Sequence, residues 1–128
     1  VDNGIQTFVI SWKNPTKDQG VWGMADYVRS CRLAMDTVSA ITGSKTVNVS
    51  AGCSGGQTAS VLASQLASEG SAQLGALTIM VCVLHPKQTD SEAGSLISEN
   101  GLALARRRAQ KAGIIKGDDL TRGFAWLR

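Results

Sequence analysis

The stretch Thr46-Val-Asn-Val-Ser-Ala-Gly-Cys53-Ser-Gly-Gly56 decides how this chain is organised. A β-branched apolar run ends abruptly in a cysteine, and a Ser-, Ala- and Leu-rich segment typical of a helix follows it. A strand that turns directly into a helix lifts the residue at the turn above the edge of the sheet. The pattern therefore predicts a strand-to-helix elbow that exposes the side chain of Cys53.

The elbow needs small neighbours because the strand and helix backbones nearly touch there. The small residues on either side of the cysteine are Ala51, Gly52, Gly55 and Gly56. We expect Cys53 in a strained conformation at a helix N-terminus, where N–H groups and the helix dipole favour a thiolate. The backbone N–H of Ser54 would then be one donor to an oxyanion. Local sequence leaves two readings open, a catalytic nucleophile or an ordinary small residue buried at a strand end.

The residues around the elbow alternate between strand-like and helix-like patterns. Apolar residues at steps of three and four predict a helix over 24–41, and Gly43 suits its C-terminus. Predicted strands cover residues 6–12, begin at Val47, and cover residues 77–84. This alternation predicts right-handed crossovers and a parallel sheet. The expected fold class is α/β, as a partial α/β-hydrolase fold with a nucleophile elbow.

The character of the chain changes after Leu84. Residues 85–90 are expected to form a loop, residues 102–112 a helix ended by Gly113, and residues 120–127 another short helix. The predicted organisation is therefore a partial α/β-hydrolase core over 1–84 and the beginning of a mostly helical cap, or an all-helical appendage, over 85–128.

Composition narrows the function classes. The chain has 128 residues, of which 43% are hydrophobic and 18% charged, as in a globular domain. Its longest apolar run, 74–84, has the length of a buried strand, so no transmembrane segment is expected. Three cysteines and one histidine without a CxxC pair argue against a metal site and favour free thiols in a reducing compartment.

Residues 85–128 hold eight basic and five acidic residues, which accounts for the whole net charge of +3. The one basic cluster combines Arg106, Arg107, Arg108 and Lys111. A solvated helix face explains it, and contact with an anionic surface is the alternative. No aromatic residues interleave the cluster as a base-stacking platform requires, so no nucleic-acid partner is expected.

The remaining thiols and the histidine have simpler readings. Cys31 lies on the apolar face of the first predicted helix and Cys82 in a predicted buried strand, so both are expected in the core. His85 follows that strand directly, where a catalytic histidine is not expected, because in α/β-hydrolases the histidine comes last, after the acid. The chain is therefore predicted to hold a nucleophile without a base.

Several motifs now identify a family. They are Phe8-Val-Ile-Ser-Trp12-Lys-Asn14-Pro15, Trp22-Gly23, Ile41-Thr-Gly43-Ser-Lys45, Gly52-Cys53-Ser-Gly55-Gly56, Ala76-Leu77-Thr78 and Phe124-Ala-Trp126-Leu-Arg128. In consistent order over nearly the whole chain, they resemble poly(3-hydroxyalkanoate) synthases, in particular the pseudomonad, medium-chain-length (class II) type. The resemblance implies an internal fragment of such an enzyme.

The resemblance implies an acyltransferase that polymerises (R)-3-hydroxyacyl-CoA into polyester and releases CoA, with Cys53 carrying the acyl chain. The catalytic Asp and His of the family would lie downstream of Arg128, outside this chain. The CoA thioester is the substrate, and no further cofactor is implied. The implied partners are the growing polyester, the surface of a polyester granule and a second copy of the full-length enzyme. The implied location is cytoplasmic, at those granules.

The chain departs from the family pattern at Ala51, where glycine is usual, at His85, where an acidic residue is usual, and over 86–101. Two other functions stay open. One is an α/β-hydrolase with a cysteine nucleophile, either a thioesterase or a lactone hydrolase. The other is a polypeptide that is not catalytic as isolated, because its sheet would have open edges.

Overall fold

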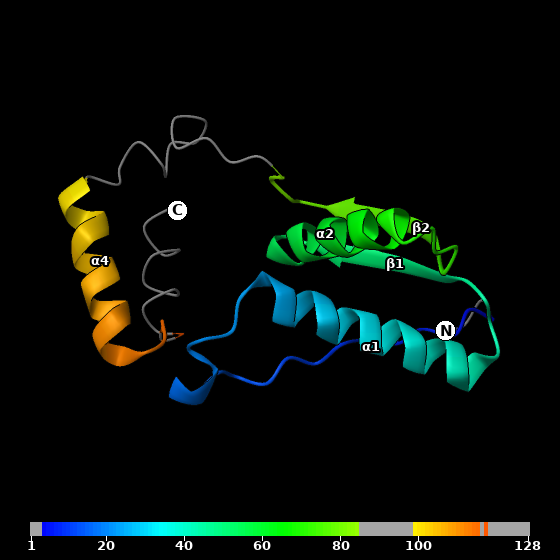
Figure 1. Cartoon of the computed structure of the whole chain (residues 1–128), viewed down its shortest axis with the longest axis horizontal. Helices are drawn as coiled ribbons and strands as arrows, with labels where there is room; N and C mark the ends of the chain where they lie inside the picture. The colour runs from blue at the N-terminus through cyan, green and yellow to red at the C-terminus, as the bar shows by residue number, and fades with distance from the viewer. Residues whose placement is uncertain (1–3, 85–98, 116, 118–128) are drawn as a thin grey trace. The chain divides into compact units, whose positions relative to one another are not determined.

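The computed structural model describes residues 4–84, 99–115 and 117 (Figure 1). The chain divides into two compact units. The first unit comprises residues 1–12 and 22–84, and the second comprises residues 13–21 and 85–128. The short segment 13–21 thus groups with the second unit. The assignment of a core and a cap remains a prediction.

The first unit alternates helices and strands, in the order α1 (Met24–Thr42), β1 (Val47–Gly52), α2 (Ser54–Ser68) and β2 (Leu74–Met80). The predicted first helix is confirmed. Its N-terminus is capped because the Asp26 carboxylate accepts the Gly23 N–H at 2.9 Å. Its C-terminus is closed by Gly43 in the left-handed region, at φ 70°.

The two strands pair in parallel, as predicted, and Gly52 and Met80 are the last partners in their register. The α2 helix connects the strands and packs against both (Figure 1). The predicted bounds of the last strand, 77–84, are wrong, since β2 starts and ends earlier. It ends at Met80 because Val81 has a φ of 50°, which is not compatible with an extended strand.

The core of this unit lies between the two helices and one face of the sheet. Val28 and Met35 of α1 and Leu62 and Leu66 of α2 form its buried cluster. Val47, Val49 and Leu74 from the strands pack against that cluster. Burial of each such side chain stabilises the fold by about 1.5–3 kcal/mol. The two buried residues are seven positions apart in α1 and four apart in α2, as expected for the apolar stripe of an amphipathic helix.

Two polar contacts join α1 to the chain beyond the end of α2. Arg32 Nη1 lies 2.8 Å from Glu69 Oε2, and Gln73 Nε2 donates to Asp36 Oδ1 at 2.9 Å. The Arg32 guanidinium beside it lowers the pKa of the Glu69 carboxyl. These contacts lie at the opposite end of α2 from Cys53.

The predicted first strand, 6–12, is wrong, because residues 5–16 have no regular secondary structure. The segment was expected to be covered on both faces, yet its apolar side chains are exposed, Val9 to 87%. A strand requires a hydrogen-bonded neighbour, and the sheet formed by the described residues contains β1 and β2 alone. Within this segment, Trp12 makes an aromatic contact with Tyr27 of α1, with 5.6 Å between the ring centroids.

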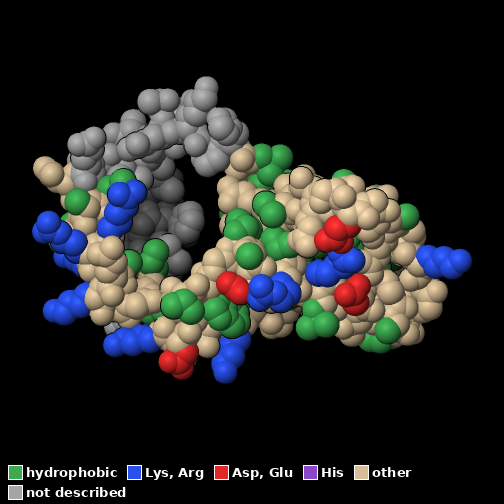
Figure 2. Space-filling model, in the orientation of Figure 1, with side chains coloured by type: hydrophobic (Ala, Val, Ile, Leu, Met, Phe, Trp, Pro, Cys, Tyr) green, Lys and Arg blue, Asp and Glu red, His purple; other side chains and the backbone are tan. Residues whose placement is uncertain are grey.

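The second unit contains the 3₁₀ helix η1 (Lys17–Gln19) and the helix α4 (Glu99–Ala112). The predicted helix over 102–112 is confirmed with an earlier start, and Gly113 ends it at φ 76°. Lys and Arg side chains gather along α4 (Figure 2). The predicted loop 85–90 and helix 120–127 lie outside the described residues. Within the described ranges, no helix is both long enough and apolar enough to cross a membrane.

Candidate active site at the Cys53 elbow

Cys53 stands at the junction predicted from the sequence, directly after β1 and at the N-cap of α2. Its backbone has φ 52° and ψ −132°, a combination that side-chain-bearing residues rarely adopt. Such a conformation costs about 1–3 kcal/mol and persists only where the surrounding structure enforces it. The expected strained turn is therefore present. Its side chain is exposed, so a reactant can reach the thiol.

Two backbone hydrogen bonds hold Cys53 in this conformation. Its N–H donates to the carbonyl oxygen of Met80, at the end of β2, over 3.0 Å. Its own carbonyl oxygen accepts the N–H of Gly56, in the first turn of α2, also over 3.0 Å. The geometry of Cys53 thus depends on where the end of β2 and the start of α2 lie.

The close approach between helix and sheet falls at Gly56. A Cβ on this buried glycine would lie 2.7 Å from Cys82 Sγ and 2.9 Å from Ile79 Cγ2, so a side chain there would force its neighbours to move. A Cβ on Gly55 would meet nothing within 4 Å, and one on Gly52 would lie 3.9 Å from the Met80 oxygen. Of the three glycines expected to be small for steric reasons, Gly56, three residues after Cys53, is therefore the one that has no room for a side chain.

The first backbone N–H groups of α2 lie at its N-terminus, next to Cys53. Ser54 and Gly55 are the first two residues of this helix, and the first N–H groups of a helix have no partner further back in the chain. Together with the helix dipole they favour a negative charge in front of the helix. The geometry is compatible with Ser54 as an oxyanion donor, which remains a prediction.

The end of β2 forms a second unusual turn beside the elbow. Val81 has φ 50° and is 93% exposed. Cys82 follows it, half-buried against Gly56, and the Gln57 side-chain amide donates to the Val83 carbonyl oxygen at 2.8 Å. The prediction of Cys82 inside a buried strand is therefore wrong. Neither Gln57 nor Cys82 carried a sequence signal of this contact, because it depends on how β2 ends.

The other titratable groups do not extend the site. Cys31 packs against the core, as predicted, and burial raises the pKa of its thiol. All three cysteines have free thiols. Among the described residues, no three His, Cys, Asp or Glu side chains lie together as a metal site. His85, with its predicted loop position, lies outside the described residues.

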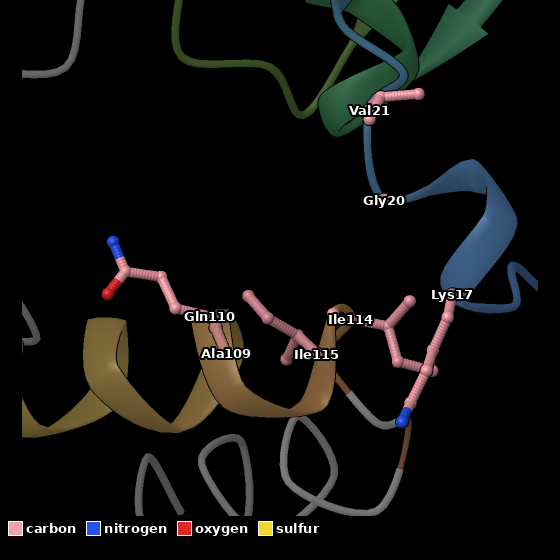
Figure 3. Close-up of a pocket in the computed structure, with 8 residues that line it drawn as sticks. Lys17, Gly20, Val21, Ala109, Gln110, Ile114 and Ile115 are labelled. Carbon is pink, nitrogen blue, oxygen red and sulfur yellow. The ribbon is translucent and has the colours of Figure 1, made fainter.

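A shallow pocket of about 500 Å³ lies within the second unit (Figure 3). Lys17, Gly20 and Val21 form one wall, and the end of α4 with Ile114 and Ile115 forms the other. Gly20 allows the two walls to meet, because a Cβ there would lie 2.5 Å from the Gly113 oxygen. Among the described residues that line it, Lys17 is the one with an ionisable side chain, and they offer no nucleophile or acid–base pair.

Comparison with known proteins points to one family. Poly(3-hydroxyalkanoate) polymerase 1 of Ectopseudomonas oleovorans is 41% identical over 123 residues, which cover 96% of this chain and 22% of the relative. Polymerase 2 of the same organism is 32% identical over 127 residues, covering 98% of this chain and 22% of the relative. The poly(3-hydroxyalkanoate) polymerase subunit PhaC of Rhizobium etli is 34% identical over 133 residues, which cover 100% of this chain and 20% of the relative.

No protein-family model and no solved structure matches the chain. The similarity to the polymerases runs across the whole of it, including the elbow, and the chain spans about a fifth of the length of these curated relatives. Along its whole length, this chain is similar to a segment of proteins of the poly(3-hydroxyalkanoate) polymerase family.

Proposed function

We propose that this chain is the nucleophile-bearing part of a poly(3-hydroxyalkanoate) polymerase and that Cys53 carries the acyl group. One observation supports this most directly. The exposed thiol of Cys53 stands in a strained turn between a parallel strand and the N-terminus of α2, in a chain similar to proteins named as these polymerases. A buried structural cysteine needs neither the strain nor the exposure.

The first step exchanges one thioester for another. The Cys53 sulfur attacks the carbonyl carbon of a 3-hydroxyacyl-CoA, the bond to the CoA sulfur breaks, and CoA leaves with the proton that the Cys53 thiol gave up. The two thioesters have similar free energies, so little energy is lost. The oxyanion formed during attack would be stabilised by the Ser54 N–H at the start of α2.

The second step forms an ester. The hydroxyl group of the next monomer or of the chain end attacks the acyl carbon on Cys53, and its proton must pass to a base. The resemblance to the family implies a His oriented by an Asp, both outside these 128 residues. Water competes with the hydroxyl group, so the site has to be closed during turnover.

The proposal includes the fold and surroundings that the resemblance implies. Residues 1–84 would form part of an α/β-hydrolase core and residues 85–128 the start of its cap. The parallel pair β1 and β2 with its crossover helix α2 supports the first assignment. A medium-chain monomer, a homodimer, and a cytoplasmic location at polyester granules complete the proposal, and they rest on the resemblance alone.

The test follows the acyl group. The purified protein that carries this chain is incubated with an (R)-3-hydroxyacyl-CoA, free CoA is measured, and the Cys53 peptide is analysed by mass spectrometry. We expect one CoA released for each acyl group found on Cys53, followed by polymer. Free 3-hydroxy acid without polymer would make the protein a thioesterase. CoA release without acylation of Cys53, or no release at all, would overturn the proposal.

A further inference from the structure

Val81 adopts a conformation that its own side chain does not explain. A β-branched residue at positive φ is a genuine outlier, because Cβ approaches the following carbonyl oxygen. Its φ is 50°, yet its side chain is 93% exposed and buries almost nothing in return. The benefit of the turn must therefore lie in the residues that it directs.

The turn brings the next two residues onto the first turn of α2. Cys82 packs its Sγ and Cβ atoms against Gly56, at the place where a Cβ would collide. Val83 presents its carbonyl oxygen to the Gln57 amide, which donates to it at 2.8 Å. A strained residue, a close packing contact and a side-chain hydrogen bond thus join the segment after β2 to residues 56 and 57.

The same two segments supply both backbone partners of Cys53. Met80, which accepts the Cys53 N–H, immediately precedes Val81. Gly56, which donates to the Cys53 carbonyl oxygen, immediately precedes Gln57 and is the residue that Cys82 packs against. Movement of Val81–Val83 away from α2 would therefore disturb both hydrogen bonds at once.

We propose that Gln57 and Cys82 are positioning residues, which clamp the end of β2 to the first turn of α2 and so hold Cys53 in its reactive geometry. The inference rests on the proposed function, because it assigns these residues a part in acyl transfer to Cys53. Neither residue needs to touch the substrate, so their effect falls on the rate of transfer more than on substrate binding.

The central test removes the hydrogen bond and keeps the shape of the side chain. Gln57→Met has nearly the same length as glutamine and no N–H. The matched control is Gln65→Met in the same helix, where the Gln65 amide donates to the Glu69 side chain instead. We expect Gln57→Met to lower kcat for acyl transfer about three- to tenfold with KM unchanged, the size of effect that a single lost hydrogen bond produces.

Two further measurements separate positioning from general destabilisation. The first is the hydrogen-exchange protection of the Gly56 N–H, which Gln57→Met should reduce and Gln65→Met should not. The second is the pH profile of Cys53 alkylation by iodoacetamide, followed by mass spectrometry, with Cys31 as internal reference. Gln57→Glu adds a check, since its carboxylate cannot donate to the Val83 oxygen, whereas its protonated form at low pH can. Gly56 protection should return as that carboxylate is protonated.

Each outcome decides the inference. A lower kcat with weaker Gly56 protection in Gln57→Met alone supports it. Equal behaviour of Gln57→Met and Gln65→Met overturns it, and so does weaker protection with unchanged kcat and alkylation. Iodoacetamide requires no CoA substrate. If the wild-type protein transfers no acyl group, the proposed function fails, while the alkylation profile still shows whether Gln57 positions the Cys53 thiol.

Discussion

The two strands of the first unit end beside one another, and each ends in a non-glycine residue at positive φ. Cys53 follows β1 at φ 52°, Val81 follows β2 at φ 50°, and the residues before them, Gly52 and Met80, are register partners. After Cys53 the chain enters a helix and the side chain stays exposed. After Val81 the chain folds against that helix, and the next side chain, Cys82, packs on Gly56.

The difference teaches how backbone strain is used at this edge of the sheet. At Cys53 the strained residue is itself the reactive group of the proposed mechanism. At Val81 the strained residue is exposed and has no reactive group, and the residues after it make the contacts with α2. Strain of this kind persists only where other contacts oppose it. Substitutions at the two turns should therefore have different effects on the rate of transfer and on the free energy of unfolding.

The largest effect on acyl transfer is expected from replacing Cys53, and a smaller one from replacing Cys82. Cys53→Ala should abolish acyl transfer and polymer formation, because it removes the thiol that forms the proposed thioester. Cys82→Ala should lower the rate without abolishing it, since Cys82 acts through packing. CoA release assays on both variants provide the measurement. Substantial turnover by Cys53→Ala would contradict the proposed nucleophile.

A single methyl group at Gly56 should strain the junction. Gly56→Ala places a Cβ within 3 Å of Cys82 and Ile79, and overpacking of this kind costs about 1–3 kcal/mol. The free energy of unfolding, measured in urea, should fall accordingly. Gly55→Ala is the matched control, because its Cβ has open space and alanine favours a helix by up to about 1 kcal/mol over glycine. Equal losses in the two variants would contradict the assigned contact.

The strain at Val81 can be removed directly. Val81→Gly should raise the free energy of unfolding by about 1 kcal/mol or less, because relief of about 1–2 kcal/mol of left-handed strain outweighs the entropy of the added glycine. Val83→Gly, two residues later, should instead lower it by about 0.5–1 kcal/mol. Both side chains are exposed. Thermal unfolding measures both changes. A gain in stability for Val81→Gly with a loss for Val83→Gly would support the assigned strain, and a loss of stability in both variants would contradict it.

The smallest effect is expected at the far end of α2, away from both turns. The pKa of Glu69 is lowered in the folded protein, first by its hydrogen bond from Arg32. Its stabilising contribution is therefore fully present above the unfolded pKa of about 4.3 and is lost as the pH falls through the lower folded value. In Glu69→Gln, the free energy of unfolding should no longer show this small decrease at low pH, and the alkylation of Cys53 should be unchanged. An unchanged curve would show that the pair contributes nothing.

Local patterns predicted much of the first unit correctly. The helix α1 follows from apolar steps of three and four residues, and α2 follows from a Ser-, Ala- and Leu-rich segment. The core residues Val28 and Met35 of α1 and Leu62 and Leu66 of α2 lie on the apolar faces of these helices. The elbow follows from small residues between a β-branched run and a helical one. These features succeed because each depends on interactions within a few residues of the chain.

The failures share one cause, which is that strands depend on distant partners. Residues 6–12 have the composition of a strand, yet they pair with no strand of the described sheet. The run 77–84 is apolar throughout, and its last four residues nevertheless leave the strand at Val81. Composition measures the tendency to pair, whereas pairing itself requires a neighbour at the right register.

The sequence pattern was enough to predict the helices α1 and α2, the parallel order of β1 and β2, and the place of Cys53 at the start of α2. Which glycine is sterically required, and which contacts hold the elbow, depend on the tertiary structure. Gly56 is needed because Cys82 lies against it, and Gln57 matters because Val83 comes within hydrogen-bonding distance. These contacts join residues about 26 positions apart, and such long-range contacts arise from packing that no local pattern records.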